Sequence, residues 1–65
     1  MQIKLNGEPK EIQASTLEQL VSSYRLNPEA IVIELNNVIA RKQTWATTAL
    51  NIGDRVEIVS FVGGG

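Results

Sequence analysis

Residues 53–65 read GDRVEIVSFVGGG, and no other stretch says as much about the fold. Gly53-Asp54 marks a turn. The next residues alternate in character, so Val56 and Ile58 share one face of a strand over residues 55–62. The opposite face of that strand carries Arg55, Glu57, Val59 and Phe61. We therefore predict a final strand with one buried face, followed by a glycine tail at residues 63–65.

The N-terminal residues predict a β-hairpin. Apolar residues at positions 1, 3 and 5 alternate with polar ones, which is the period of a half-buried strand. Asn6-Gly7 is a strong two-residue hairpin signal. We expect Glu8-Pro9 to extend the turn and a second strand to cover residues 10–14, with Ile12 facing inward.

A single amphipathic helix follows over residues 16–24. Ser15 and Glu18 have the spacing of a capping box, and Asn27-Pro28 is expected to end the helix, because proline disfavours helical backbone in the residue before it. The apolar residues at i, i+3, i+4 and i+7 are Leu17, Leu20, Val21 and Tyr24.

The second half of the chain predicts a return to strands. Residues 31–35 read as a third strand, Asn36-Asn37 as a tight turn and residues 38–39 as a short return strand. Residues 41–50 are expected to form a loop or a short helical turn, with Trp45 covering the edge of the core. This order predicts an α+β domain, a mixed sheet packed on one helix with the first and last strands side by side at its centre. A helix-free β meander is the less favoured alternative.

Composition excludes several function classes. The chain of 65 residues has room for one domain, and it contains neither cysteine nor histidine, which removes thiolate and imidazole chemistry and the usual zinc ligand sets. Its seven acidic residues form no carboxylate dyad or metal-loop pattern, so we expect no metal site and no catalysis by the chain alone. A net charge of -1 without a basic run argues against nucleic-acid binding. Without a membrane span or export signal, a cytoplasmic protein is expected.

These features together resemble the ubiquitin-like β-grasp family, and within it the ThiS sulfur carriers of thiamine biosynthesis. The resemblance covers the whole chain and implies a four- to five-stranded sheet on one main helix, with a β-grasp domain at residues 1–62 and a flexible functional tail at residues 63–65. Ser60 departs from the histidine expected in many relatives. The matching pieces are Leu5-Asn6-Gly7-Glu8, Glu34-Leu35-Asn36, Arg41, Trp45 and residues 53–59 running into the terminal glycines.

The resemblance implies a carrier rather than an enzyme. A ThiF-like adenylating enzyme would activate the Gly65 carboxylate with its own ATP, a cysteine desulfurase or another donor would supply sulfur, and a ThiG-like thiazole synthase would receive it from the resulting thiocarboxylate. Gly63 and Gly64 would thread both active sites, since they have no side chain to obstruct a narrow channel. No tightly bound cofactor is expected, and the carrier alone is expected to be a monomer.

The open face of the last strand suggests where a partner docks. Val59 and Phe61 place an apolar patch beside the tail, and Val62 and Val32 are expected to extend it. We interpret this patch as the docking surface for the adenylating enzyme, the alternative being exposed apolar residues without a special role.

Three other functions remain open from the sequence. The small subunit of molybdopterin synthase shares the expected fold and tail chemistry. A ubiquitin-like protein modifier would transfer the same activated carboxylate to a lysine. A noncovalent β-grasp interaction module would leave the glycine tail inert, so deleting Gly64 and Gly65 would have no effect on it.

Overall fold

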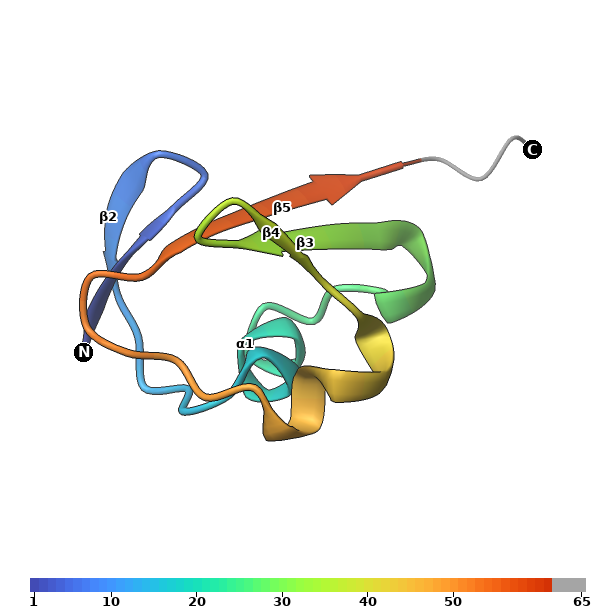
Figure 1. The fold of residues 1–65 in the computed structure, drawn as a ribbon, viewed down its shortest axis with the longest axis horizontal. Helices are drawn as coiled ribbons and strands as arrows, with labels where there is room; N and C mark the ends of the chain where they lie inside the picture. Colours follow the sequence, from blue (N-terminus) through green and yellow to red (C-terminus); the bar gives the residue numbers. More distant parts are fainter. Residues whose placement is uncertain (62–65) are drawn as a thin grey trace.

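The computed structural model describes residues 1–61, which form one five-stranded sheet covered on one face by helical segments (Figure 1). The spatial strand order is β2-β1-β5-β3-β4. Strand β1 runs parallel to β5, and the other neighbouring pairs are antiparallel. The strands are β1 (Gln2–Leu5), β2 (Glu8–Glu11), β3 (Ile31–Leu35), β4 (Val38–Ala40) and β5 (Arg55–Ser60). The predicted mixed sheet is confirmed, with the first and last strands adjacent and β5 at the centre.

The hydrophobic core lies between the sheet and the helical layer. Helix α1 (Leu17–Ser23) and the 3₁₀ helix η2 (Lys42–Thr47) lie on the same side of the sheet, and a shorter 3₁₀ helix, η1 (Pro28–Ala30), leads into β3 (Figure 1). The side chains with the least solvent exposure come from both layers, and they are Ile3, Leu17, Leu20, Ile33 and Val56. Burial of Val56 therefore fixes which face of β5 is turned inward.

The first hairpin is tighter than the sequence predicts. Asn6 and Gly7 alone form the loop, both with positive φ (51° and 84°), and Glu8 already pairs with Leu5. The expectation that Glu8-Pro9 extends the turn is wrong, because Pro9 lies in β2 opposite Lys4. Since β2 is an edge strand, a proline without an N–H costs no ladder bond there. Strand β2 also ends at Glu11 instead of residue 14, although Ile12 is buried as predicted.

The start of α1 is capped one residue later than expected. The Thr16 hydroxyl accepts a hydrogen bond from the Gln19 backbone N–H (3.2 Å), and the Gln19 side chain accepts one from the Ser15 N–H (2.7 Å). The N-cap predicted at Ser15 is therefore wrong: Thr16 is the N-cap and Gln19 is its partner, although the Gln19 side chain reaches back to the Ser15 N–H instead of the Thr16 N–H of a complete capping box. Both pairs satisfy the same sequence spacing, so the motif alone does not distinguish them.

Helix α1 ends within one residue of the predicted Tyr24, but the residues that end it are not the predicted Asn27-Pro28. Arg25 adopts a left-handed conformation (φ 55°), its N–H donates to the Ser22 carbonyl, and the Leu26 N–H donates to the Val21 carbonyl. This is the hydrogen-bond pattern of a Schellman motif, which terminates the helix before Asn27-Pro28 is reached. Tyr24 consequently caps the helix and is 44% exposed instead of completing its buried face.

The remaining elements follow the sequence closely. Asn36 and Asn37 both have positive φ and connect β3 to β4 as predicted. Trp45 on η2 is only 5% exposed and donates its indole N–H to the Ala40 carbonyl (2.9 Å), which confirms its structural role. Strand β5 ends at Ser60, two residues before the predicted boundary. None of the helices within residues 1–61 has the length and apolar character to cross a membrane.

Candidate functional site: the open face and end of β5

Strand β5 is held on both sides by neighbouring strands, and its C-terminal end leads to the glycines. Its outward face carries Arg55, Glu57, Val59 and, just after the strand, Phe61, as the alternation predicts. Phe61 remains tied to the fold because its N–H donates to the Ala30 carbonyl (2.9 Å). The predicted site residues Val62, Gly63, Gly64 and Gly65 lie outside the described residues.

An apolar patch occupies the end of this face. Val32 on β3 stands directly opposite Val59 on β5, and paired residues of adjacent strands project from the same face of a sheet. Their exposed fractions are 40% and 61%, and that of Phe61 is 47%. The structure thus brings together the three predicted docking residues that it describes, on the face of the sheet away from α1. We call Val32, Val59 and Phe61 the apolar patch.

Charged residues continue the same face toward the start of β5. Lys4 on β1 is paired with Arg55, and Glu34 on β3 is paired with Glu57. None of these four side chains belongs to an ion pair within residues 1–61; the ion pairs formed there join Met1 to Glu11, Lys10 to Glu8, and Lys42 to Glu29. Lys4, Arg55 and Glu57 are exposed to solvent, and Glu34 is half-buried.

Side-chain hydrogen bonds from the turns hold β5 in place, and the sequence analysis did not anticipate them. The Asn6 side-chain oxygen accepts from the Ile58 N–H (2.7 Å), while the Asn6 N–H donates to the Val56 carbonyl (2.8 Å). Asn6 thereby extends the β1–β5 contact beyond the last paired residues, Leu5 and Val56. The hairpin signal at Asn6-Gly7 predicted the turn, but it does not indicate that the Asn6 side chain reaches β5.

A second turn secures the beginning of β5. The Asn36 side chain accepts a hydrogen bond from the Arg55 N–H (2.9 Å) and donates one to an Asp54 carboxylate oxygen (3.0 Å). The other Asp54 carboxylate oxygen accepts from the Asn51 N–H (2.7 Å). The start of β5 is therefore fastened to the β3–β4 turn by bonds between residues distant in sequence.

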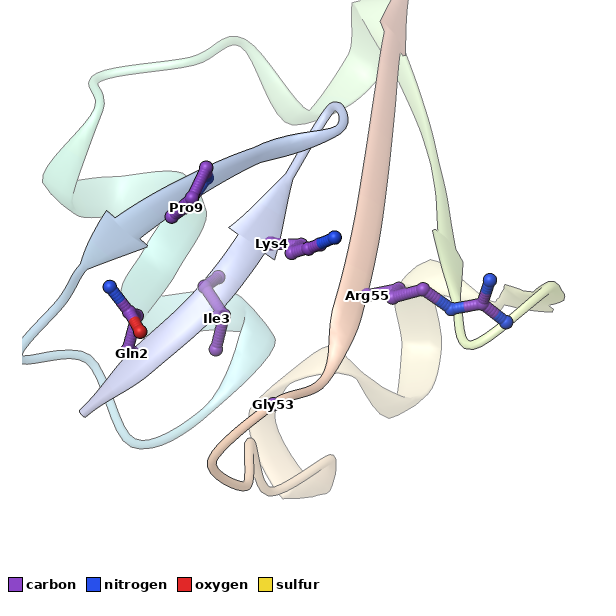
Figure 2. Close-up of a pocket in the computed structure, with 6 residues that line it drawn as sticks. All are labelled: Gln2, Ile3, Lys4, Pro9, Gly53 and Arg55. Carbon is purple, nitrogen blue, oxygen red and sulfur yellow. The ribbon is translucent and has the colours of Figure 1, made fainter.

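A hollow of about 310 Å³ opens beside the start of β5 and is lined by residues of β1, β2 and the preceding turn. Figure 2 shows Lys4 extending from β1 toward β5 and Arg55 extending from β5 on the side away from β1. The full lining is Gln2, Ile3, Lys4, Pro9, Gly53 and Arg55. Because β5 runs from this hollow toward Ser60, the hollow and the apolar patch lie at opposite ends of β5.

The described residues offer binding surface instead of catalytic groups. Among residues 1–61 no cluster of three or more carboxylate, imidazole or thiol groups is placed to hold a metal ion. The chain also contains no histidine or cysteine to act as a base or a nucleophile. What the described residues present is an exposed sheet face with an apolar patch at one end and charged residues at the other.

Comparisons of sequence and of structure with known proteins identify the same family. A profile of the ThiS family matches residues 3–65. The sulfur carrier protein ThiS of Bacillus subtilis is 34% identical over 65 residues, which cover 97% of this chain and 98% of that protein. The crystal structure of a thiamine biosynthesis protein (ThiS) from Geobacter metallireducens superimposes over the full length of both chains with a TM-score of 0.85 and 28% sequence identity.

Two longer proteins are also similar. The thiazole synthases of Magnetococcus marinus and Paramagnetospirillum magneticum are each 38% identical over 66 residues. The match includes all of this chain but only 20% of each thiazole synthase. This chain therefore corresponds to one segment of those proteins.

Proposed function

The chain belongs to the ThiS family, and from that premise we propose that it carries sulfur for thiamine biosynthesis on the C-terminal carboxylate of Gly65. The observation that carries the proposal is the extent of the family match, which runs from Ile3 in β1 to the terminal glycines. The chain acts as a co-substrate of other enzymes, in the cytoplasm where ATP is at hand, and needs no tightly bound cofactor of its own.

The proposed chemistry begins with activation of a poor electrophile. A partner enzyme joins the Gly65 carboxylate to the AMP portion of ATP and releases pyrophosphate. The terminal sulfur of a persulfide, supplied by a cysteine desulfurase or another donor, attacks the acyl carbon and displaces AMP. A thiol then cleaves the sulfur–sulfur bond, leaving a thiocarboxylate on the carrier and a disulfide on the donor side. The carrier has no cysteine, so it has no thiol of its own that could attack the activated carboxylate.

The length of the tail limits where the partner's active site can lie. Residues 62–65 follow Phe61, and an extended chain spans at most about 3.5 Å per residue. The Gly65 carboxylate thus reaches no more than about 14 Å beyond Phe61. An enzyme acting on that carboxylate must therefore contact the surface around the end of β5, and the apolar patch is the exposed surface at this end of the open face.

The apolar patch is accordingly proposed as the docking surface for a ThiF-like adenylating enzyme. Exposed apolar side chains gathered on one face are typical of protein interaction sites, where their burial stabilises the complex. Gly63 and Gly64 then thread the active site, and Val62 extends the patch toward them.

A ThiG-like thiazole synthase is the proposed recipient of the sulfur. Two proteins named thiazole synthase contain a segment similar to this entire chain. In those proteins a carrier-like segment is covalently attached to the remaining polypeptide, which supports a functional association between the carrier and the synthase.

Intact-mass measurement tests the proposal directly. The protein is incubated with ATP, cysteine, a cysteine desulfurase and the recombinant ThiF-like enzyme of the same organism. Replacing one carboxylate oxygen by sulfur should raise the mass by the difference between those atoms, and deleting Gly65 should remove the gain. If the mass does not change while the same enzymes convert a known ThiS protein, the sulfur-carrier proposal is wrong. Conjugation to lysine would instead produce a covalent adduct of much higher mass.

A pair of variants tests the docking patch. Val59→Ser should raise the KM of adenylation about tenfold or more, because it removes one of the three patch side chains from a desolvated contact. Ile52→Ser is the matched control, since Ile52 is also strongly exposed but lies in the turn before β5. Equal KM values for both variants and the parent protein would rule out the patch as the docking surface.

A further inference from the structure

The open face of β5 has an order that the apolar patch alone does not explain. Along β5 its outward residues run from basic to acidic to apolar: Arg55, Glu57 and Val59. In each case the residue paired with it on the neighbouring strand has the same character. The matched rows are Lys4 with Arg55, Glu34 with Glu57, and Val32 with Val59.

Matching charges across strands gives the isolated protein no direct gain. Like charges at directly opposed positions of a sheet repel each other, whereas opposite charges there attract. Ion pairs do form elsewhere in the described chain, for example between Lys42 and Glu29. The four charges of the open face have no such partner within residues 1–61, so their arrangement is suited to a surface that approaches from outside.

We propose that the rows form a docking code for the adenylating enzyme that acts on Gly65. The enzyme's complementary surface carries acidic groups opposite Lys4 and Arg55, basic groups opposite Glu34 and Glu57, and an apolar recess opposite the apolar patch. This inference rests on the function proposed above and identifies the chemistry of the partner surface.

The spacing of the rows determines what the code can do. Successive outward residues on a strand are about 7 Å apart, which exceeds the roughly 4 Å over which an ion pair forms. A partner in contact therefore meets a basic row and an acidic row as distinct features. At longer range the two rows cancel, and the net charge of the chain is only -1. The code thus fixes orientation in the complex and contributes little to long-range attraction.

Orientation matters here because the tail is short. If the carrier docked after a half-turn of this face, Lys4 and Arg55 would face the apolar recess and the apolar patch would face acidic groups. Charges would then be buried without partners, which is strongly unfavourable. The correct orientation places the end of β5, and with it the chain that leads to Gly65, toward the active site. The code consequently selects the one docking geometry in which the carboxylate is within reach.

The test is a charge exchange that leaves composition almost unchanged. A quadruple variant combines Lys4→Glu and Arg55→Glu with Glu34→Lys and Glu57→Lys, so the net charge stays at -1 while the two charged rows trade places. The matched control exchanges Glu29 and Lys42 (Glu29→Lys with Lys42→Glu), which preserves an ion pair away from the open face. Binding of each to the recombinant adenylating enzyme is followed by surface plasmon resonance.

The quadruple variant should bind about 30-fold more weakly or worse, almost entirely through faster dissociation, with the association rate changed less than about threefold. The control should bind like the parent protein. Binding of the quadruple variant within about twofold of the parent overturns the docking code. A loss carried mainly by slower association also overturns it, because that result would indicate long-range steering.

A milder pair keeps the test meaningful if the quadruple variant unfolds. Glu34→Gln with Glu57→Gln removes one charged row with little change of shape, and it should weaken binding about three- to tenfold. Circular dichroism and thermal melting of each variant report folding.

The mass assay separates this inference from the proposed function. If the parent protein gains sulfur and the variants bind the enzyme as tightly as the parent, only the docking code is refuted. A parent that neither binds the enzyme nor gains sulfur refutes both.

Discussion

Asn6 offers a sharp test of how the turn supports β5. Its backbone has positive φ (51°), and its side-chain oxygen accepts from the Ile58 N–H at 2.7 Å. Loss of a hydrogen bond typically costs about 1 kcal/mol, and a non-glycine residue without a polar side chain in the left-handed region costs roughly another 1 kcal/mol. Asn6→Ala should thus destabilise the domain by about 2 kcal/mol.

Two further substitutions at the same position separate the contributions. Asn6→Gly loses the hydrogen bond but tolerates the positive φ, so it should cost about 1 kcal/mol. Asn6→Asp keeps the acceptor oxygen and should cost less than about 0.5 kcal/mol. Asn37 is a suitable control position, because its φ is also positive (71°) while its side chain makes no hydrogen bond within residues 1–61. Asn37→Ala should therefore show the backbone cost alone, about 1 kcal/mol.

Urea and thermal unfolding followed by circular dichroism measure these differences. For a domain of this size 1 kcal/mol shifts the Tm by roughly 4–8 °C, so Asn6→Ala should melt about 8–16 °C below the parent. Hydrogen exchange at the Ile58 amide should accelerate in the alanine and glycine variants but not in the aspartate variant. An aspartate variant as unstable as the glycine variant would refute the acceptor role of the side chain. Equal stability of the alanine and glycine variants would refute the backbone contribution.

Three other outcomes are expected. Arg25→Gly should stabilise the domain by about 0.5–1 kcal/mol in urea unfolding, because glycine accepts the left-handed conformation at the end of α1; a loss of stability would contradict the Schellman motif as the origin of that conformation. Trp45→Phe should destabilise by about 1–3 kcal/mol in the same assay, since it removes both the bond to the Ala40 carbonyl and buried volume, and an unchanged midpoint would refute the structural role. Gly64→Val should leave the melting curve unchanged but abolish adenylation, so normal adenylation of this variant would exclude threading through a narrow channel.

Much of the fold was predictable because its signals are local. The alternation in β5 assigned Val56 to the core and Val59 to the open face, and both assignments are confirmed. Asn6-Gly7 and Asn36-Asn37 marked the two hairpin turns, because these residue types tolerate positive φ. The helical period of residues 17–21 correctly placed α1 against the core.

The errors arose where a local rule allowed two answers or where the local signal was incomplete. Ser15 and Thr16 could both cap α1, and the structure uses Thr16, whose hydroxyl is bonded to the Gln19 N–H. Asn27-Pro28 was predicted to end the helix, but the chain leaves it earlier because Arg25, an ordinary residue at a position that favours glycine, adopts positive φ. Pro9 was assigned to a turn because the edge position of β2, where proline is harmless, follows from the sheet order.

The candidate site shows the same division between local pattern and long-range arrangement. The glycines, the alternation along β5 and the apolar character of Val59 and Phe61 are properties of a short stretch and follow from the chain's chemistry alone. The matched rows depend on strand register, which pairs Lys4 with Arg55 and Glu34 with Glu57 across long intervals of sequence. Register is set by packing the inward residues against α1, and a shift of one residue would turn every outward side chain into the core. For that physical reason the residues of the tail can be read along the chain, whereas the matched rows of the open face exist only after folding.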